Sequence, residues 1–180
     1  MNDFQIRTSP EYAIVGETRL QLQSLLDECF PGWFDGRSYV KQFPHFRYLA
    51  MEGESVVGQL GVDVRVINVG GTVIPIMGLL DTAVRHDRRN NGIATKLLET
   101  AEHHASDGGL EFLVLMSDRH DLYLKAGYHR IQPAPTKWLA IEDRQSVQVI
   151  ERDLSDCFMA KPLTDKTWPT GTIDMLGYMF

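Results

Sequence analysis

Residues 74–101 constrain the fold more than any other part of this 180-residue chain. An apolar run over 74–80, extended by Ala83 and Val84, has the consecutive aliphatic residues of a buried strand. A polar loop with three arginines follows, and Gly92 then opens a segment with an amphipathic stripe. The stripe consists of Ile93, Leu97, Leu98 and Ala101. The sequence therefore predicts a strand, a polar loop and a helix in direct succession.

Such a loop is suited to binding an anion. The first turn of a helix has four backbone N–H groups without partners inside the helix, and the helix dipole places positive potential there. Gly92 and Ala94 carry little bulk, so an oxygen-rich group can approach the backbone. The spacing Arg89-x-x-Gly92-x-Ala94 matches neither the phosphate loop of nucleotide triphosphatases nor the three-glycine dinucleotide fingerprint.

Two motifs carry a resemblance to a known family. Val84-x-x-Asp87-x-Arg89-x-x-Gly92-Ile93-Ala94 resembles the acetyl-coenzyme A motif of the GNAT superfamily of N-acetyltransferases. The segment Leu122-Tyr-Leu-Lys-Ala-Gly-Tyr128 resembles that family's Leu-Tyr-x-Lys-x-Gly-Phe/Tyr. The resemblance covers about residues 45–131 well. The last residues, 176–180, are faintly similar to the ends of nodulation N-acyltransferases and aminoglycoside-type acetyltransferases.

The resemblance implies one GNAT domain over residues 1–180, with an α+β fold in which helices flank a central mixed, twisted sheet. It implies acetyl-CoA as co-substrate and no metal. The pyrophosphate would be held by backbone groups of Arg89, Asn90, Asn91, Gly92, Ile93, Ala94 and Thr95. A bulge would open the preceding strand, so that Ala83 and Val84 offer backbone groups to the pantetheine arm and the thioester.

Two residues are candidates for the chemistry. Tyr123 has the position of the family's general acid, and a phenol with a pKa of about 10 can protonate a thiolate whose thiol pKa is about 8.5. Asp81 is the only carboxylate on its strand, and many family members place a Glu one residue earlier, where this chain has Leu80. Asp81 is equally compatible with a base acting through water, an anchor for the ammonium group, or a structural partner of the loop.

Acceptor contacts are expected from two segments. Trp33 and Phe34 belong to an aromatic, irregular stretch that forms the substrate-side wall in the GNAT arrangement, although aromatic residues there fit a core role equally well. Ser117 and His120 precede Tyr123 closely enough to reach the same site. Adjacent histidines at 103 and 104 point about 100° apart on a helix and do not suggest a shared metal.

Composition excludes several classes. The hydrophobic share of 43% and charged share of 23% are those of a soluble globular domain, and no apolar run is long enough to span a membrane. A net charge of −6 argues against general nucleic-acid binding and favours a cationic substrate. The start lacks a signal region, so we expect a cytoplasmic protein with both cysteines reduced and no membrane partner. A homodimer remains open.

The sequence thus predicts an acetyl-CoA-dependent N-acetyltransferase that acts by direct attack of a primary amine of a small, cationic acceptor. Transfer of a longer acyl chain or transfer to a hydroxyl is the alternative within enzymes. A non-catalytic acyl-CoA-binding module of the same fold is the other alternative, because Leu80 replaces the family's Glu.

The remaining elements are predicted from alternation and turn residues. Strands at 46–51 and 55–68 joined by a Gly53 turn, and a third strand after a Gly70–Gly71 hairpin, precede the loop. The strand–helix–strand crossover predicts parallel pairing of the strands around Val84 and Val114. From residue 132 onward the pattern is weak, with strands expected only at 137–141 and 157–163.

Overall fold

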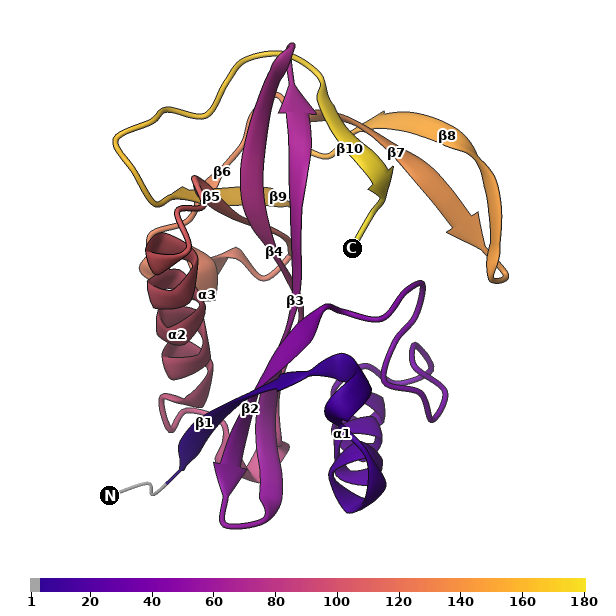
Figure 1. Ribbon diagram of the computed structural model, residues 1–180, viewed down its shortest axis with the longest axis vertical. Helices are drawn as coiled ribbons and strands as arrows, with labels where there is room; N and C mark the ends of the chain where they lie inside the picture. Colours follow the sequence, from indigo (N-terminus) through magenta and orange to yellow (C-terminus); the bar gives the residue numbers. More distant parts are fainter. Residues whose placement is uncertain (1–3) are drawn as a thin grey trace. The chain divides into compact units, whose positions relative to one another are not determined.

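The computed structural model describes residues 4–180 as a mixed sheet with three α-helices (Figure 1). The helices are α1 (Gly16–Cys29), α2 (Ile93–Asp107) and α3 (His120–Lys125), with 3-10 turns η1 (Glu11–Ala13) and η2 (His86–Arg88). The strands are β1 (Gln5–Pro10), β2 (Phe46–Glu52), β3 (Ser55–Val69), β4 (Thr72–Val84), β5 (Phe112–Met116), β6 (His129–Arg130), β7 (Pro135–Glu142), β8 (Gln145–Asp153), β9 (Phe158–Pro162) and β10 (Ile173–Tyr178). The predicted α+β class is therefore confirmed.

The sheet has the order β6-β9-β5-β4-β3-β10-β7-β8, and β2 pairs with both β1 and β3. The crossover through α2 joins β4 to β5 in parallel, as predicted. In this pairing Val114 lies opposite Gly78. Hydrophobic pattern alone does not fix the register of two apolar strands that are buried along their length.

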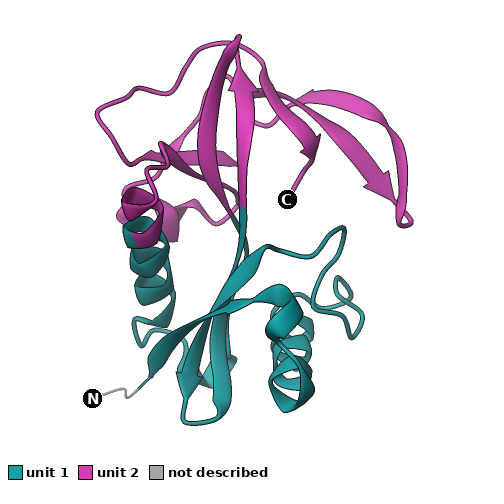
Figure 2. Ribbon diagram, viewed as in Figure 1, with its two compact units in different colours: residues 1–63, 79–103 teal, residues 64–78, 104–180 magenta. Residues whose placement is uncertain are grey.

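The described chain divides into two compact units (Figure 2). Unit 1 comprises residues up to 63 together with 79–103, and unit 2 comprises 64–78 and 104–180. In unit 1, α1 buries Leu22, Leu25 and Leu26, the i, i+3, i+4 stripe that the sequence predicts. This stripe packs in a core whose other buried members are Ile14, Phe34, Leu49, Met51, Val56 and Ala83.

In unit 2, β5 is the central strand that its apolar run predicts, because the first four of its residues are buried. Two aromatic rings of the core meet Trp168 edge-on, Phe112 at 5.0 Å and Phe158 at 5.7 Å between ring centroids. The other core members in this unit include Ile67, Val69, Ile74, Ile76, Val114, Ala160, Ile173 and Met175.

Two predicted turns are confirmed. Gly53 has φ 59° between β2 and β3, and the pair Gly70–Gly71 has φ 57° and 95° between β3 and β4. Left-handed backbone of this kind favours glycine, because a Cβ would crowd the neighbouring carbonyl. The Gly53 turn accompanies the antiparallel pairing of β2 with β3 in unit 1.

The weakly patterned end of the chain is more regular than predicted. β7 and β8 form an antiparallel hairpin, and β10 pairs in parallel with β7 and antiparallel with β3. Almost every residue of β8 is exposed, so this strand has no buried face that could produce alternation in the sequence. None of the helices in the described part of the chain is long and apolar enough to cross a membrane.

Candidate active site

The strand, loop and helix predicted from residues 74–101 are present in this order. β4 ends at Val84, η2 forms a short turn, and Lys96 N–H donates to the carbonyl of Gly92 at 2.9 Å, which starts α2. Asn90 and Gly92 have left-handed backbone, with φ 63° and 78°. A Cβ added at Gly92 would meet no atom within 4 Å, so the backbone in front of α2 is open to a ligand. The first amides of α2 lack intrahelical partners by geometry.

The start of α2 packs closely against Gly58. A Cβ at Gly58 on β3 would lie 2.8 Å from Ile93 Cγ2 and 3.2 Å from the carbonyl oxygen of Ala83. These two distances, one to a branched side chain and one to backbone, leave no room for a side chain at position 58. Gly58 therefore fixes the depth at which the first turn of α2 packs on the strand.

The three arginines of the loop hold the loop itself. Arg85 Nε donates to Asp87 at 2.6 Å, and this hydrogen bond lowers the pKa of Asp87. Arg88 Nε lies 2.9 Å from both carboxylate oxygens of Glu52. Arg89 Nε donates to the Val84 carbonyl at 3.2 Å. The arginine side chains are thus engaged with acceptors in the loop and its neighbours.

Asp81 interrupts the alternation of β4. Its φ of 52° is left-handed, and the Gln59 side-chain amide donates to its backbone carbonyl. A non-glycine residue in this region marks a local distortion that surrounding contacts must hold. Burial raises the pKa of the Asp81 carboxyl, while the positive charges of Arg47 and Lys41 oppose that shift. A distortion at this strand, expected from the resemblance, is therefore observed at Asp81.

A buried polar network reaches the backbone of Asp81 through Gln59, and no local pattern in the sequence indicates it. Arg47 is fully buried on β2 and donates to Glu11 at 2.5 Å and to the Gln59 side-chain oxygen at 2.7 Å. Its third contact is the Ser38 carbonyl, and Ser38 Oγ donates to Glu11 at 2.9 Å. The partners are up to 36 residues apart, and no spacing in the sequence connects them.

The predicted residues of unit 2 have defined surroundings. Tyr123 on α3 is 8% exposed, and its ring meets Tyr128 edge-on at 5.7 Å between centroids. His120 Nε2 lies 2.8 Å from the Asp156 carbonyl. Ser117 Oγ accepts a hydrogen bond from the Arg119 amide at 3.0 Å. These three side chains come from one segment, the end of β5 and the start of α3.

The two predicted aromatic contacts differ. Trp33 is 58% exposed, and a side chain that open can meet a ligand. Phe34 has no exposed surface, lies in the unit 1 core, and stacks in a tilted arrangement with Phe30 at 5.7 Å. We therefore assign Phe34 to the core.

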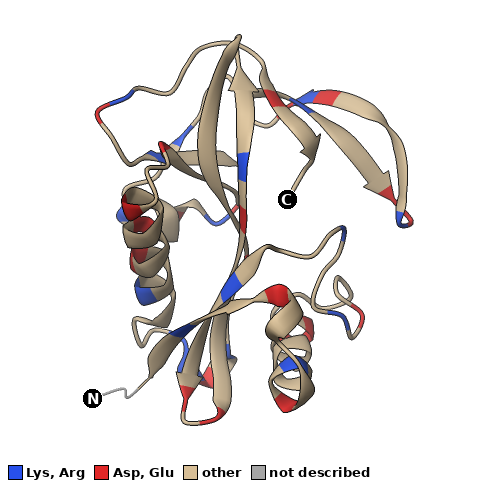
Figure 3. Ribbon diagram, in the orientation of Figure 1, with Lys and Arg blue, Asp and Glu red and all other residues tan. Residues whose placement is uncertain are grey.

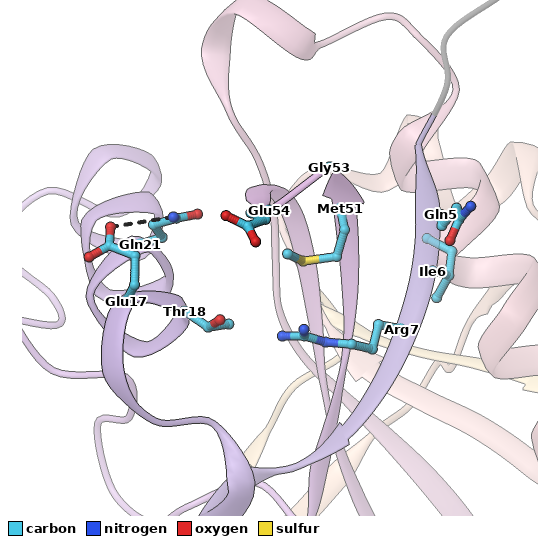
Figure 4. A pocket seen from close by; sticks show the side chains of 9 residues that line it. All are labelled: Gln5, Ile6, Arg7, Glu17, Thr18, Gln21, Met51, Gly53 and Glu54. Carbon is cyan, nitrogen blue, oxygen red and sulfur yellow. Dashed lines mark hydrogen bonds between the residues drawn. The ribbon is translucent and has the colours of Figure 1, made fainter.

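Other features of the surface do not coincide with these residues. Acidic side chains outnumber basic ones along both α1 and α2, so each helix carries part of the net negative charge (Figure 3). A polar groove in unit 1 is lined by β1, α1 and the β2–β3 turn, including Arg7, Glu17 and Glu54 (Figure 4). It shares no residue with the loop or the Asp81 network. Over residues 4–180 no cluster of three or more metal-ligating side chains occurs.

A mixed sheet with a distorted strand, an open loop and a helix start defines the class of GNAT-fold acyltransferases. The family model described as "Acetyltransferase (GNAT) domain" matches residues 7–131. The chain belongs to this family of acetyltransferases, as the two motifs predict.

Solved structures agree on the fold. The GNAT family N-acetyltransferase YhbS from Escherichia coli, determined in complex with CoA, is 17% identical with a TM-score of 0.68, covering 95% of this chain and 88% of that one. A GNAT family acetyltransferase from Brucella melitensis, in complex with acetyl-CoA, is 17% identical with a TM-score of 0.56, covering 96% of each chain.

Some of the other matches are longer proteins. The chain spans 33% of Eis1 from Mycobacterium abscessus, at 14% identity over 74% of this chain and a TM-score of 0.59. A search of curated protein sequences finds no significant match.

Proposed function

We propose that this protein uses acetyl-CoA to acetylate a primary amine of a small, cationic acceptor by direct attack of the amine on the thioester. The observation that carries the proposal is the open backbone from Asn90 to Thr95, where left-handed residues precede the first turn of α2. Amides at such a helix start attract a diphosphate through hydrogen bonds and the helix dipole. The E. coli and Brucella structures, which contain CoA and acetyl-CoA, support the same choice of co-substrate.

Residues of the loop fit the co-substrate through shape. Gly92 leaves space for an oxygen-rich group, and the arginine side chains keep the loop in position through Asp87, Glu52 and the Val84 carbonyl. Ala83 and Val84 are proposed to offer backbone groups to the pantetheine arm. Since backbone performs this binding, we expect side-chain changes in the loop to act mainly through loop geometry.

The cationic character of the acceptor is proposed from Asp81. Its carboxyl is half-buried next to the distortion of β4, and a buried carboxylate favours a positively charged partner. The net charge of −6 acts in the same direction over longer distances. Exposed Trp33, together with Ser117 and His120, remain the proposed acceptor contacts.

Tyr123 is proposed as the general acid that protonates the departing thiolate. Support comes from the Leu-Tyr-x-Lys-x-Gly match around it and from its limited exposure, which keeps the phenol in a fixed orientation on α3. Tyr123→Phe is expected to lower turnover about 10²-fold, the usual range for removal of a general acid. Tyr12→Phe, an 84% exposed tyrosine on η1, is the matched control and should leave turnover unchanged.

The test is CoA thiol release from acetyl-CoA over a panel containing spermidine, benzylamine and aniline, with thermal shift recorded in parallel. Ligand at 100 times its Kd stabilises a protein by about 2.7 kcal/mol, so binding should raise the melting temperature visibly. Stabilisation by acetyl-CoA with no thiol release from any amine would instead favour a non-catalytic acyl-CoA-binding module. Absence of both responses would remove the proposal.

A further inference from the structure

His45 lies immediately before β2 and is held by three contacts. Its backbone N–H donates to the Val62 carbonyl at 2.8 Å, and its own carbonyl accepts from the Glu11 amide at 3.3 Å. Its Nδ1 lies 3.1 Å from Asp63 Oδ1. The His45 side chain is 56% exposed and that of Asp63 only 3%. The imidazole is therefore anchored at its base, oriented by a buried carboxylate, and still accessible to small molecules.

The pairing sets the chemistry of the ring. An ionised carboxylate only accepts hydrogen bonds, so the neutral imidazole carries its hydrogen on Nδ1 and its lone pair on Nε2. A buried carboxylate that holds the ring in one tautomer and stabilises the imidazolium is the arrangement by which histidine acts as a general base. Asp63 on β3 provides this arrangement.

The pair lies beside the Asp81 distortion, within unit 1. Residues 59, 61 and 63 share one face of β3, since side chains alternate along a strand. At Gly61 an added Cβ would lie 3.4 Å from Pro44 Cγ and 3.3 Å from the Leu80 carbonyl oxygen. Pro44 directly precedes His45 and Leu80 directly precedes Asp81, so both segments pack on the same glycine.

We propose that His45 is the general base that takes the proton from the acceptor ammonium, and that Asp63 is its positioning residue. This inference rests on the proposed function and deepens it. The ammonium N–H bond breaks and its proton moves to Nε2 of His45, directly or through a water. The freed lone pair forms the C–N bond to the acetyl carbon, the C–S bond breaks, and the nitrogen releases its second proton to give the neutral amide. The thiolate takes a proton from Tyr123, the proposed general acid, and leaves as the CoA thiol, and Tyr123 is then reprotonated. The imidazolium then returns its proton to solvent.

Charged groups on the packed elements shape this site. Asp63 contacts the ring directly, and Arg47 on β2 is paired with Glu11 on η1. Asp81 and Lys41 influence each other electrostatically, and burial lowers the pKa of Lys41. In this proposal the exposed imidazole of His45 is the base, and the carboxyl of Asp81 attracts the ammonium. Of the three roles predicted for Asp81, the proposal selects the ammonium anchor.

The experiment compares His45→Gln, Asp63→Asn and the control His129→Gln, an exposed histidine on β6. Rates are measured with benzylamine, an ammonium at neutral pH, and with aniline, which is already neutral. His45→Gln should lower kcat/KM for benzylamine about 10²-fold and change the rate with aniline by less than about threefold. Without this base the reaction depends on free benzylamine, so the acidic limb of its pH profile should move to higher pH in His45→Gln. Asp63→Asn should show the same selectivity with a smaller loss, and His129→Gln should match the wild type.

Equal losses with both amines, or no loss with benzylamine, would overturn the assignment. The CoA affinity of His45→Gln, measured by calorimetry, must stay within about threefold of the wild-type value, which separates a lost base from a misfolded variant. If His45→Gln does not fold, Asp63→Asn decides by the same comparison of the two amines. A wild-type enzyme that releases thiol while His45→Gln is unimpaired refutes only the base. A wild-type protein that releases no thiol refutes the proposed function and this inference with it.

Discussion

The loop at residues 85–95 and the Asp81 network belong to the same unit but are built in opposite ways. The loop leaves its backbone open in front of α2, while its arginines are engaged with neighbouring acceptors at the surface. The network places a fully buried Arg47 between Glu11 and Gln59, and its contact with Gln59 leads to the backbone of Asp81. We therefore expect backbone conformation to control ligand binding at the loop, and side-chain pairing to control the geometry of the β4 distortion.

The largest expected difference is in stability. Arg47→Met removes the fully buried partner of Glu11, which keeps only the partly exposed Arg19, and leaves the Gln59 and Ser38 acceptors without a donor. It should lower the free energy of unfolding by about 3–5 kcal/mol. Arg88→Met removes a partly exposed ion pair with Glu52, and should change the free energy of unfolding by no more than about 1 kcal/mol. Urea unfolding of both variants gives the comparison. Equal losses would show that the loop and the network are not built differently.

The next difference is in ligand affinity. Gly92→Ala and Gly53→Ala both place a Cβ on left-handed backbone with open space around it, so each should cost about 1–2 kcal/mol of stability. Only Gly92→Ala brings a methyl group to the proposed diphosphate site, and it should weaken CoA binding about tenfold. Calorimetric titration with CoA measures both variants. A loss of affinity in Gly53→Ala of the same size would assign the effect to strain alone.

The smallest expected effect is on pH dependence. Burial raises the pKa of Asp81 above its ordinary value of 3.8, so the native state holds this proton at pH values where the unfolded state has released it. The stability that this carboxyl contributes is therefore present below pH 3.8 and is lost as pH rises through the raised pKa. Asp81→Asn does not titrate, so its stability relative to wild type should increase over that range and then level off. A relative stability that falls with rising pH would mean that Arg47 and Lys41 outweigh burial.

The features predicted correctly are those that depend on residues close together in the sequence. The strand, loop and helix around Gly92, the hairpins at Gly53 and Gly70–Gly71, and the leucine stripe of α1 each follow from residues within a few positions of one another. The family assignment followed from two such local motifs and is confirmed over residues 7–131.

Features that depend on contacts between distant parts of the chain were not predicted. Glu11, Ser38 and Arg47 give no pattern in the chain, and only folding brings them together. The His45–Asp63 pair, which joins the residue before β2 to a residue of β3, gives no local pattern for the same reason. The strand β8 was not predicted because a strand with two exposed faces lacks alternation. The roles of Tyr123 and Asp81 stay predictions.

The central claim is that backbone amides in front of α2 receive the diphosphate of CoA. Titration of isotope-labelled protein with CoA, followed by amide chemical shifts, tests it directly. We expect the largest changes at the amides from Asn90 to Thr95, and no change there with pantetheine, which lacks the diphosphate. CoA binding with unchanged amides in this segment, or no binding at all, would contradict it.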